Sequence, residues 1–151
     1  MATLNHCRKV WTNFLSAGGF DMQALSGLKL VSASKGSILC ELDVGKEHLN
    51  RLGGCHGGLL STIVDIGGSL AIAAEDMHAT GVSTDLNVSF ISSAKMGDKL
   101  TIDSRCDKVG GTLAYTSVEI KVGDKLVALG RHTKFVRLAH EQNAKMKKES
   151  E

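Results

Sequence analysis

The feature that most constrains the fold is an apolar segment from Leu59 to Ala74 with a single charged residue, Asp65. The segment is too long for one strand, and its apolar residues would cover nearly every side of a helix. A helix that is apolar all round lies in a protein interior. The segment is also too short and, with Asp65, too polar to cross a membrane. The sequence therefore predicts one buried central helix.

Strands are predicted after this helix, because apolar residues then recur at every second position. In the first of them, one face is predicted to carry Val82, Thr84, Leu86, Val88 and Phe90, and the other Ser83, Asp85, Asn87 and Ser89. Three further strands are predicted over residues 100–109, 112–122 and 126–136. Glycines at the turns between them indicate hairpins.

The segments before the central helix complete the pattern. Apolar residues spaced by three and four predict an amphipathic helix over 3–17, and two strands are expected over 25–33 and 37–44. Consecutive hairpin-linked strands exclude a parallel doubly wound sheet. The prediction is an α+β hotdog fold, in which an antiparallel sheet of about six strands wraps around a long central helix, with an N-terminal helix. Residues 1–137 would form this single domain, and 138–151 a disordered tail.

Composition narrows the classes of function. The formal net charge of +2 argues against a dedicated nucleic-acid binder or a polybasic membrane binder. The four cysteines show no C-x-x-C spacing and no signal peptide is recognisable, so we expect reduced thiols and a cytoplasmic or mitochondrial protein. Residues 1–20 contain Arg8 and Lys9 and no acidic residue, which leaves a mitochondrial presequence open beside the preferred amphipathic helix. No metal site is expected from the spacing of His and Cys.

Asp65 is the first candidate for chemistry. A carboxylate within a buried helix must be desolvated, paired or neutralised. It is either a structural group bonded to its neighbours or a general base or nucleophile made reactive by poor solvation, and we favour the second interpretation.

The glycine-rich loop before the helix holds the other candidates. Gly57 lies where the first N–H groups of the helix are unpaired and face outward, which suits an oxyanion, or else the glycines only permit a tight turn. Asn50 is an amide donor or a turn residue, and His56 orients a neighbour or caps the loop. Ser83 begins the strand after the helix, and taken alone it indicates little.

Three blocks of this sequence resemble PaaI-like hotdog thioesterases. His56-Gly57-Gly58 followed by Asp65 matches their H-G-G-x(6)-D signature, and the preceding loop runs from His48. The segments 82–98 and 130–134 resemble a second block and the last strand of the family. The blocks occur in order, and the resemblance as a whole covers about residues 25–137.

The resemblance implies acyl-CoA hydrolysis without a cofactor. Asp65 would be the catalytic carboxylate, which activates water or attacks the thioester directly. Gly57 N–H and the Asn50 side chain would hold the thioester oxygen, His56 would support the loop, and Ser83 would position water. The positions that it implies for coenzyme A contacts are Asp85, Phe90, Ile91, Ser92, Ser93, Ala94, Lys95, Lys108, Val109, Gly110, Gly111, Thr112, Leu113 and Arg137.

Helix geometry predicts the catalytic unit. Gly57 and Asp65 are eight positions apart, which is roughly 12 Å along a helix axis, too far to serve one carbonyl group. The site must then be shared by two subunits of a homodimer, and the resemblance implies a homotetramer. Two alternatives remain. One is a non-catalytic acyl-CoA or lipid-binding hotdog protein. The other is a hotdog hydratase or dehydratase, which uses a catalytic His with an acidic partner in sequence motifs that this chain lacks.

Overall fold

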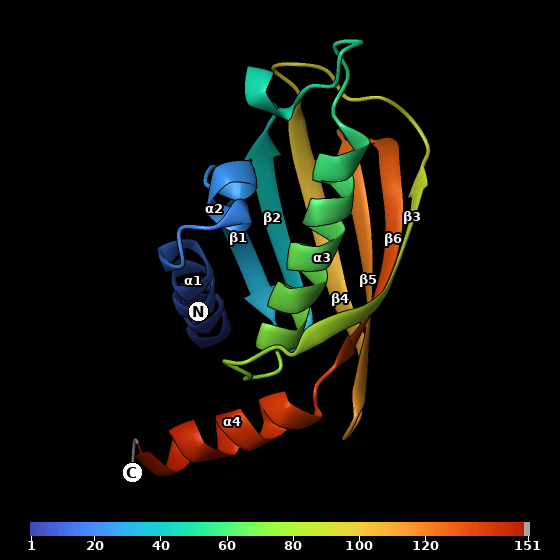
Figure 1. Ribbon diagram of the computed structural model, residues 1–151. Helices are drawn as coiled ribbons and strands as arrows, with labels where there is room; N and C mark the ends of the chain where they lie inside the picture. The colour runs from blue at the N-terminus through green and yellow to red at the C-terminus, as the bar shows by residue number, and fades with distance from the viewer. Residues whose placement is uncertain (150–151) are drawn as a thin grey trace.

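The computed structural model of the chain describes residues 1–149, which form one antiparallel sheet with helices against it (Figure 1). The six strands are β1 (Lys29–Ser34), β2 (Ser37–Asp43), β3 (Val82–Phe90), β4 (Lys99–Val109), β5 (Leu113–Val122) and β6 (Lys125–Phe135). Their order across the sheet is β1-β2-β4-β5-β6-β3, with every neighbouring pair antiparallel. The predicted α+β hotdog fold is confirmed.

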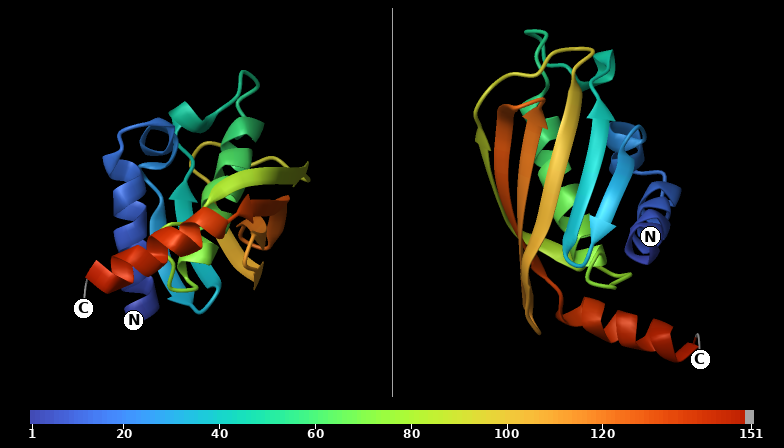
Figure 2. Two further views of the ribbon diagram at one scale, coloured as in Figure 1. Left: turned by 60° about the horizontal axis from the view of Figure 1, so that its bottom comes forward. Right: turned by 180° about the vertical axis from the view of Figure 1, so that it is seen from behind.

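The central helix α3 (Gly57–Ala73) crosses the concave face of this sheet, as Figures 1 and 2 show. Glycines let it approach closely: a Cβ on Gly68 would collide with Thr116 of β5, and one on Gly130 of β6 would collide with Val64. The predicted burial on all sides is wrong for one face of α3. Residues 57, 58, 61, 62 and 65 are partly or fully exposed, because no element of the described chain covers them.

The amino-terminal region contains two helices rather than one. The predicted first helix is α1 (Ala2–Ser16), which buries Cys7, Val10 and Trp11. After Gly18, whose φ of +66° ends that helix, a short unpredicted helix α2 (Phe20–Leu25) follows, and the strand expected over 25–33 begins only at Lys29. This correction has a simple cause, since six residues are too few to show a helical period.

The carboxy-terminal region corrects another prediction. Instead of a disordered tail over 138–151, residues Arg137–Glu149 form helix α4, while 150–151 lie outside the described residues. The buried side chain of Asn143 holds this helix. Its Oδ1 accepts hydrogen bonds from the backbone N–H groups of His78 and Ala79, at 2.7 and 3.1 Å. A polar composition did not predict this long-range contact.

Two further observations bear on the classes considered above. Among residues 1–149, no helix combines the length and the apolar character needed to span a membrane. In the same part of the chain, no group of three or more His, Cys, Asp or Glu side chains is placed to bind a metal ion.

Candidate active site

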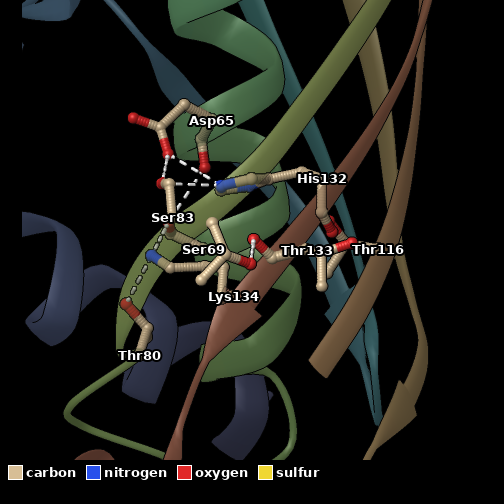
Figure 3. Close-up of polar contacts among 9 residues, drawn as sticks. Asp65, Ser69, Thr80, Ser83, Thr116, His132, Thr133 and Lys134 are labelled. Atoms are coloured by element: carbon tan, nitrogen blue, oxygen red, sulfur yellow. Dashed lines mark hydrogen bonds and ion pairs between the residues drawn. The ribbon is translucent and has the colours of Figure 1, made fainter. Parts of the chain in front are cut away.

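The first part of the site lies at the middle of α3, where three side chains meet (Figure 3). The Ser83 hydroxyl donates to Asp65 Oδ1 at 2.9 Å, and His132 Nε2 lies 3.1 Å from the same oxygen. His132 Nε2 is also 2.8 Å from Ser83 Oγ. The Asp65 side chain is 42% exposed, and its Oδ2 has no partner within residues 1–149. One carboxylate oxygen is therefore fixed while the other stays open.

A β-bulge brings Ser83 into this cluster. Ser83 pairs with Lys134 of β6, and Asp85 pairs with Thr133, so Thr84 is an extra residue. The bulge reverses the alternation, and Ser83 faces α3 together with Leu86, which pairs with His132. The predicted placement of Ser83 opposite to Leu86 is therefore wrong. Strict period-two counting cannot detect an inserted residue.

His132 is held in its neutral form. Because the single Ser83 proton is donated to Asp65, His132 Nε2 must carry the proton that it shares with Ser83 and Asp65. Its Nδ1 is buried with no partner, against the space that Gly68 leaves beside it. A proton on Nδ1 would be a buried donor without an acceptor. Burial accordingly lowers the pKa of His132 to about 4, although Asp65 opposes this shift.

A buried cation lies beneath Asp65. Lys134 Nζ donates to Ser69 Oγ at 2.6 Å and to Thr80 Oγ1 at 3.4 Å (Figure 3). The Ser69 hydroxyl in turn donates to the backbone carbonyl of Asp65 at 2.9 Å. Burial lowers the pKa of Lys134, and the negative charges of Asp65 and Asp21 oppose that shift. The carboxyl of Asp21, from α2, has a raised pKa because of burial and then because of Asp65.

The second part of the site lies at the start of α3. His56 is the N-cap, and its Nδ1 accepts the N–H of Gly58 at 2.8 Å. Asn50 Oδ1 accepts the N–H groups of Leu52 and Gly54, at 2.8 and 3.2 Å, which fixes the side chain. The Nδ2 of Asn50 has no partner in the described chain, and the N–H of Gly57 has no acceptor within the helix. The Gly57 N–H is thus a hydrogen-bond donor at the positive end of the helix dipole, and Asn50 Nδ2 is a second donor in the loop that precedes the helix.

The structure thus brings the predicted residues together in two groups and not in one. Ser83 contacts Asp65, whereas His56 and Gly57 begin α3 and Asn50 lies in the loop that precedes them. Since Gly57 and Asp65 lie on the continuous helix α3, about 12 Å of helix axis separates them. One substrate carbonyl cannot reach both groups of a single chain.

Apart from Asp85, which lies within β3, the residues predicted to contact coenzyme A also divide into two sets, at opposite ends of the sheet (Figure 1). The segment after β3 lies beside the Asn50 loop, because Cys55 N–H donates to the Ala94 carbonyl at 2.8 Å and Gly54 bridges to Lys95. The β4–β5 hairpin, residues 108–113, lies at the other end against α4, where Arg137 donates to Thr112 Oγ1 at 3.1 Å.

Two residues of this site have no predicted role, His132 and Lys134. Both lie in the 130–134 segment that carries the resemblance, and their side chains are buried on the inward face of β6. The signal that could have found them is a polar residue at an inward position of an alternating strand, which needs a partner. That partner comes from α3, more than sixty positions earlier in the chain.

The comparisons with known proteins agree with this geometry. A family model described as the thioesterase superfamily matches residues 52–129. Human acyl-coenzyme A thioesterase 13 is 41% identical over 85% of this chain and 93% of its own length. A putative esterase of Schizosaccharomyces pombe is 40% identical over 90% of this chain and 86% of its own length.

Among solved structures, zebrafish thioesterase superfamily member 2 superposes with a TM-score of 0.80 at 37% identity. The match covers 87% of this chain and 96% of the fish protein. The chain belongs to the thioesterase superfamily.

Proposed function

We propose that this protein hydrolyses acyl-CoA thioesters to a free carboxylic acid and coenzyme A. The observation that carries the proposal is the Asp65 carboxylate, whose Oδ1 is fixed by Ser83 and His132 while its Oδ2 is open. A general base needs this combination of fixed orientation and access to water. The human relative is an acyl-coenzyme A thioesterase by name, which supports the substrate class.

The chemistry follows from the two groups of side chains. Asp65 takes a proton from a water molecule, whose oxygen attacks the thioester carbonyl carbon. The carbonyl oxygen becomes an oxyanion, which accepts hydrogen bonds from Gly57 N–H and Asn50 Nδ2. Collapse restores the carbonyl and breaks the C–S bond, and Asp65 returns its proton to the coenzyme A thiolate, which regenerates the carboxylate. A general base contributes about 10²–10⁴-fold, and one oxyanion donor about 10²–10³-fold.

The catalytic unit in this proposal is a homodimer. Asp65 and Ser83 of one subunit face Gly57 and Asn50 of the other, because these groups are too far apart within one chain. The outer edge of β3 supports an interface there. Within the described residues β3 pairs on one side only, with β6, and it exposes Val82, Leu86 and Phe90. An edge strand with exposed apolar side chains is suited to contact with another chain.

The shared site also unites the two predicted coenzyme A regions. The Phe90–Lys95 segment lies at the Asn50 end of one subunit, and Lys108–Leu113 lies at the other end. If the subunits pair in opposite directions along β3, the first region of one subunit approaches the second region of its partner. Exposed Lys95 and Lys108 would then contact the phosphates of a single coenzyme A.

Release of free thiol from acyl-CoA tests the function. Wild-type protein should release coenzyme A from acyl-CoA substrates across a range of chain lengths. The Asp65→Asn variant should lose at least ~10²-fold in kcat, because the amide has nearly the same shape but cannot accept the proton. It should still bind a non-hydrolysable acyl-CoA thioether with wild-type affinity. Binding of this analogue without turnover by the wild type would instead identify a non-catalytic acyl-CoA-binding protein.

A further inference from the structure

A cavity of about 360 Å³ lies between α2 and the start of α3. Its apolar walls are formed by Phe20 and Ala24 of α2, Leu49 of the loop and Leu59 of α3. Phe20 and Ala24 are one helical turn apart, so they share the face of α2 that lines the cavity. Phe20 is 66% exposed although it is a large apolar residue.

The polar groups around this cavity are largely engaged elsewhere. His48 is buried and its Nδ1 accepts the N–H of Gly45 at 2.9 Å. His56 Nδ1 accepts the N–H of Gly58. Glu47 and Gln23 also border the hollow and are exposed. The lining therefore offers mainly apolar surface, which favours an apolar ligand.

The position of the cavity relates it to the reaction. His56 and Gly58 line it and flank Gly57, whose N–H is the proposed oxyanion donor. On the other side of Gly57 lies Phe90, since a Cβ on Gly57 would be 3.3 Å from the Phe90 ring. α2 and β3 lie on opposite sides of α3 (Figures 1 and 2). A thioester carbonyl held at Gly57 has two substituents, the coenzyme A sulfur and the acyl chain. Because the Phe90–Lys95 side is the proposed coenzyme A side, the acyl chain would extend toward the cavity.

We propose that this cavity binds the acyl chain of the substrate and that α2 sets the preferred chain length. The proposal rests on the proposed thioesterase function and adds to it a site for the hydrocarbon. An apolar cavity of about 150 Å³ holds one benzene molecule, so this cavity has room for a chain of roughly ten carbons. Each methylene transferred from water into it strengthens binding by roughly fourfold.

Narrowing the cavity tests the proposal. Ala24→Leu places three more carbons against the wall and keeps a good helix former in α2. For dodecanoyl-CoA, kept below its micelle-forming concentration, kcat/KM should fall by at least ~10-fold, because the narrowed cavity can no longer bury several methylenes of the chain. For acetyl-CoA the change should stay within about twofold. Ala144→Leu, on the exposed side of α4, is the matched control and should leave both values unchanged.

A second variant removes apolar surface without filling the cavity. Because Phe20 is exposed, Phe20→Ala should fold normally. It should lower kcat/KM for dodecanoyl-CoA several-fold, mainly through KM, and leave acetyl-CoA unaffected.

The outcomes separate this proposal from the proposed function. If the wild type hydrolyses acyl-CoA but folded Ala24→Leu and Phe20→Ala change both substrates by the same factor, the cavity does not hold the acyl chain. If the wild type releases no thiol from any acyl-CoA, the thioesterase function itself is wrong.

Discussion

The two functional regions of α3 differ in chemistry and in origin. The start of the helix presents hydrogen-bond donors, Gly57 N–H and Asn50 Nδ2, from one continuous loop and helix turn. The middle presents an acceptor, Asp65, which is held by Ser83 of β3 and His132 of β6. Thioester hydrolysis needs both a base and an oxyanion site, but one straight helix keeps them about 12 Å apart. In the proposed function, half of each active site would therefore come from another subunit.

Removing a donor at the start of α3 should have the larger effect on turnover. Asn50→Asp keeps the Oδ1 that accepts from Leu52 and Gly54, so the loop should keep its shape. It replaces the Nδ2 donor by a negatively charged oxygen. We expect kcat to fall by ~10²–10³-fold in steady-state thiol-release assays. Unchanged kcat with weaker coenzyme A binding would move Asn50 from the reaction to substrate binding.

The contrast in origin explains what the sequence could predict. The α3 helix and most strands follow from periodicity, and the Asn50 loop and Gly57 are close in sequence, so local reasoning finds them. His132 and Lys134 act through contacts with α3 that no local pattern records. The bulge at Thr84 and the anchoring of α4 by Asn143 escaped prediction for the same reason, since each depends on pairing or packing with distant residues. The short helix α2 escaped prediction because six residues are too few to show a helical period.

Loosening the middle region should cost less activity. His132→Asn shortens the side chain, so the hydrogen bond to Asp65 Oδ1 and to Ser83 Oγ is lost. Asp65 remains as a base, and we expect a loss in kcat of roughly 10-fold, about the value of one hydrogen bond to a charged group. Ser83→Ala should resemble it. A loss as large as that of Asp65→Asn would make His132 part of the chemistry and not a positioning residue.

The lowered pKa of His132 predicts that the free energy of unfolding depends on pH. In the unfolded chain His132 takes up a proton below pH 6.5, whereas in the folded protein its pKa is about 4. Native stability should therefore be complete above about pH 6.5 and fall as the pH drops toward 4, by up to about 3 kcal/mol from this group. Urea unfolding at pH 7.5 and 4.5 measures it. The free energy of unfolding should differ less between pH 7.5 and pH 4.5 in His132→Asn than in the wild type. An equal difference in both proteins would contradict the lowered pKa.

Neutralising exposed charges at the two ends of the sheet should have the smallest effect. Lys95→Gln and Lys108→Gln should each raise KM for acyl-CoA several-fold and leave KM for the acyl-pantetheine thioester unchanged, because only the nucleotide part carries the phosphates concerned. Lys9→Gln, on exposed α1, is the control. Equal effects on both substrates would place the two lysines outside the binding site.

The most direct test of the shared site is complementation between two inactive chains. One chain carries Asn50→Ala and Gly57→Pro, and the other carries Asp65→Asn. Proline is well tolerated at the first position of a helix, it deletes the Gly57 N–H, and the nearby Phe90 ring is exposed enough to move. The two chains are mixed, dissociated and allowed to reassociate.

Random pairing makes half of the dimers mixed, and each mixed dimer contains one intact site of two. The shared-site account therefore predicts recovery of about a quarter of the wild-type activity, where each parent alone shows almost none. If folded and demonstrably mixed dimers recover no activity, each site is built within a single chain, and the account is wrong.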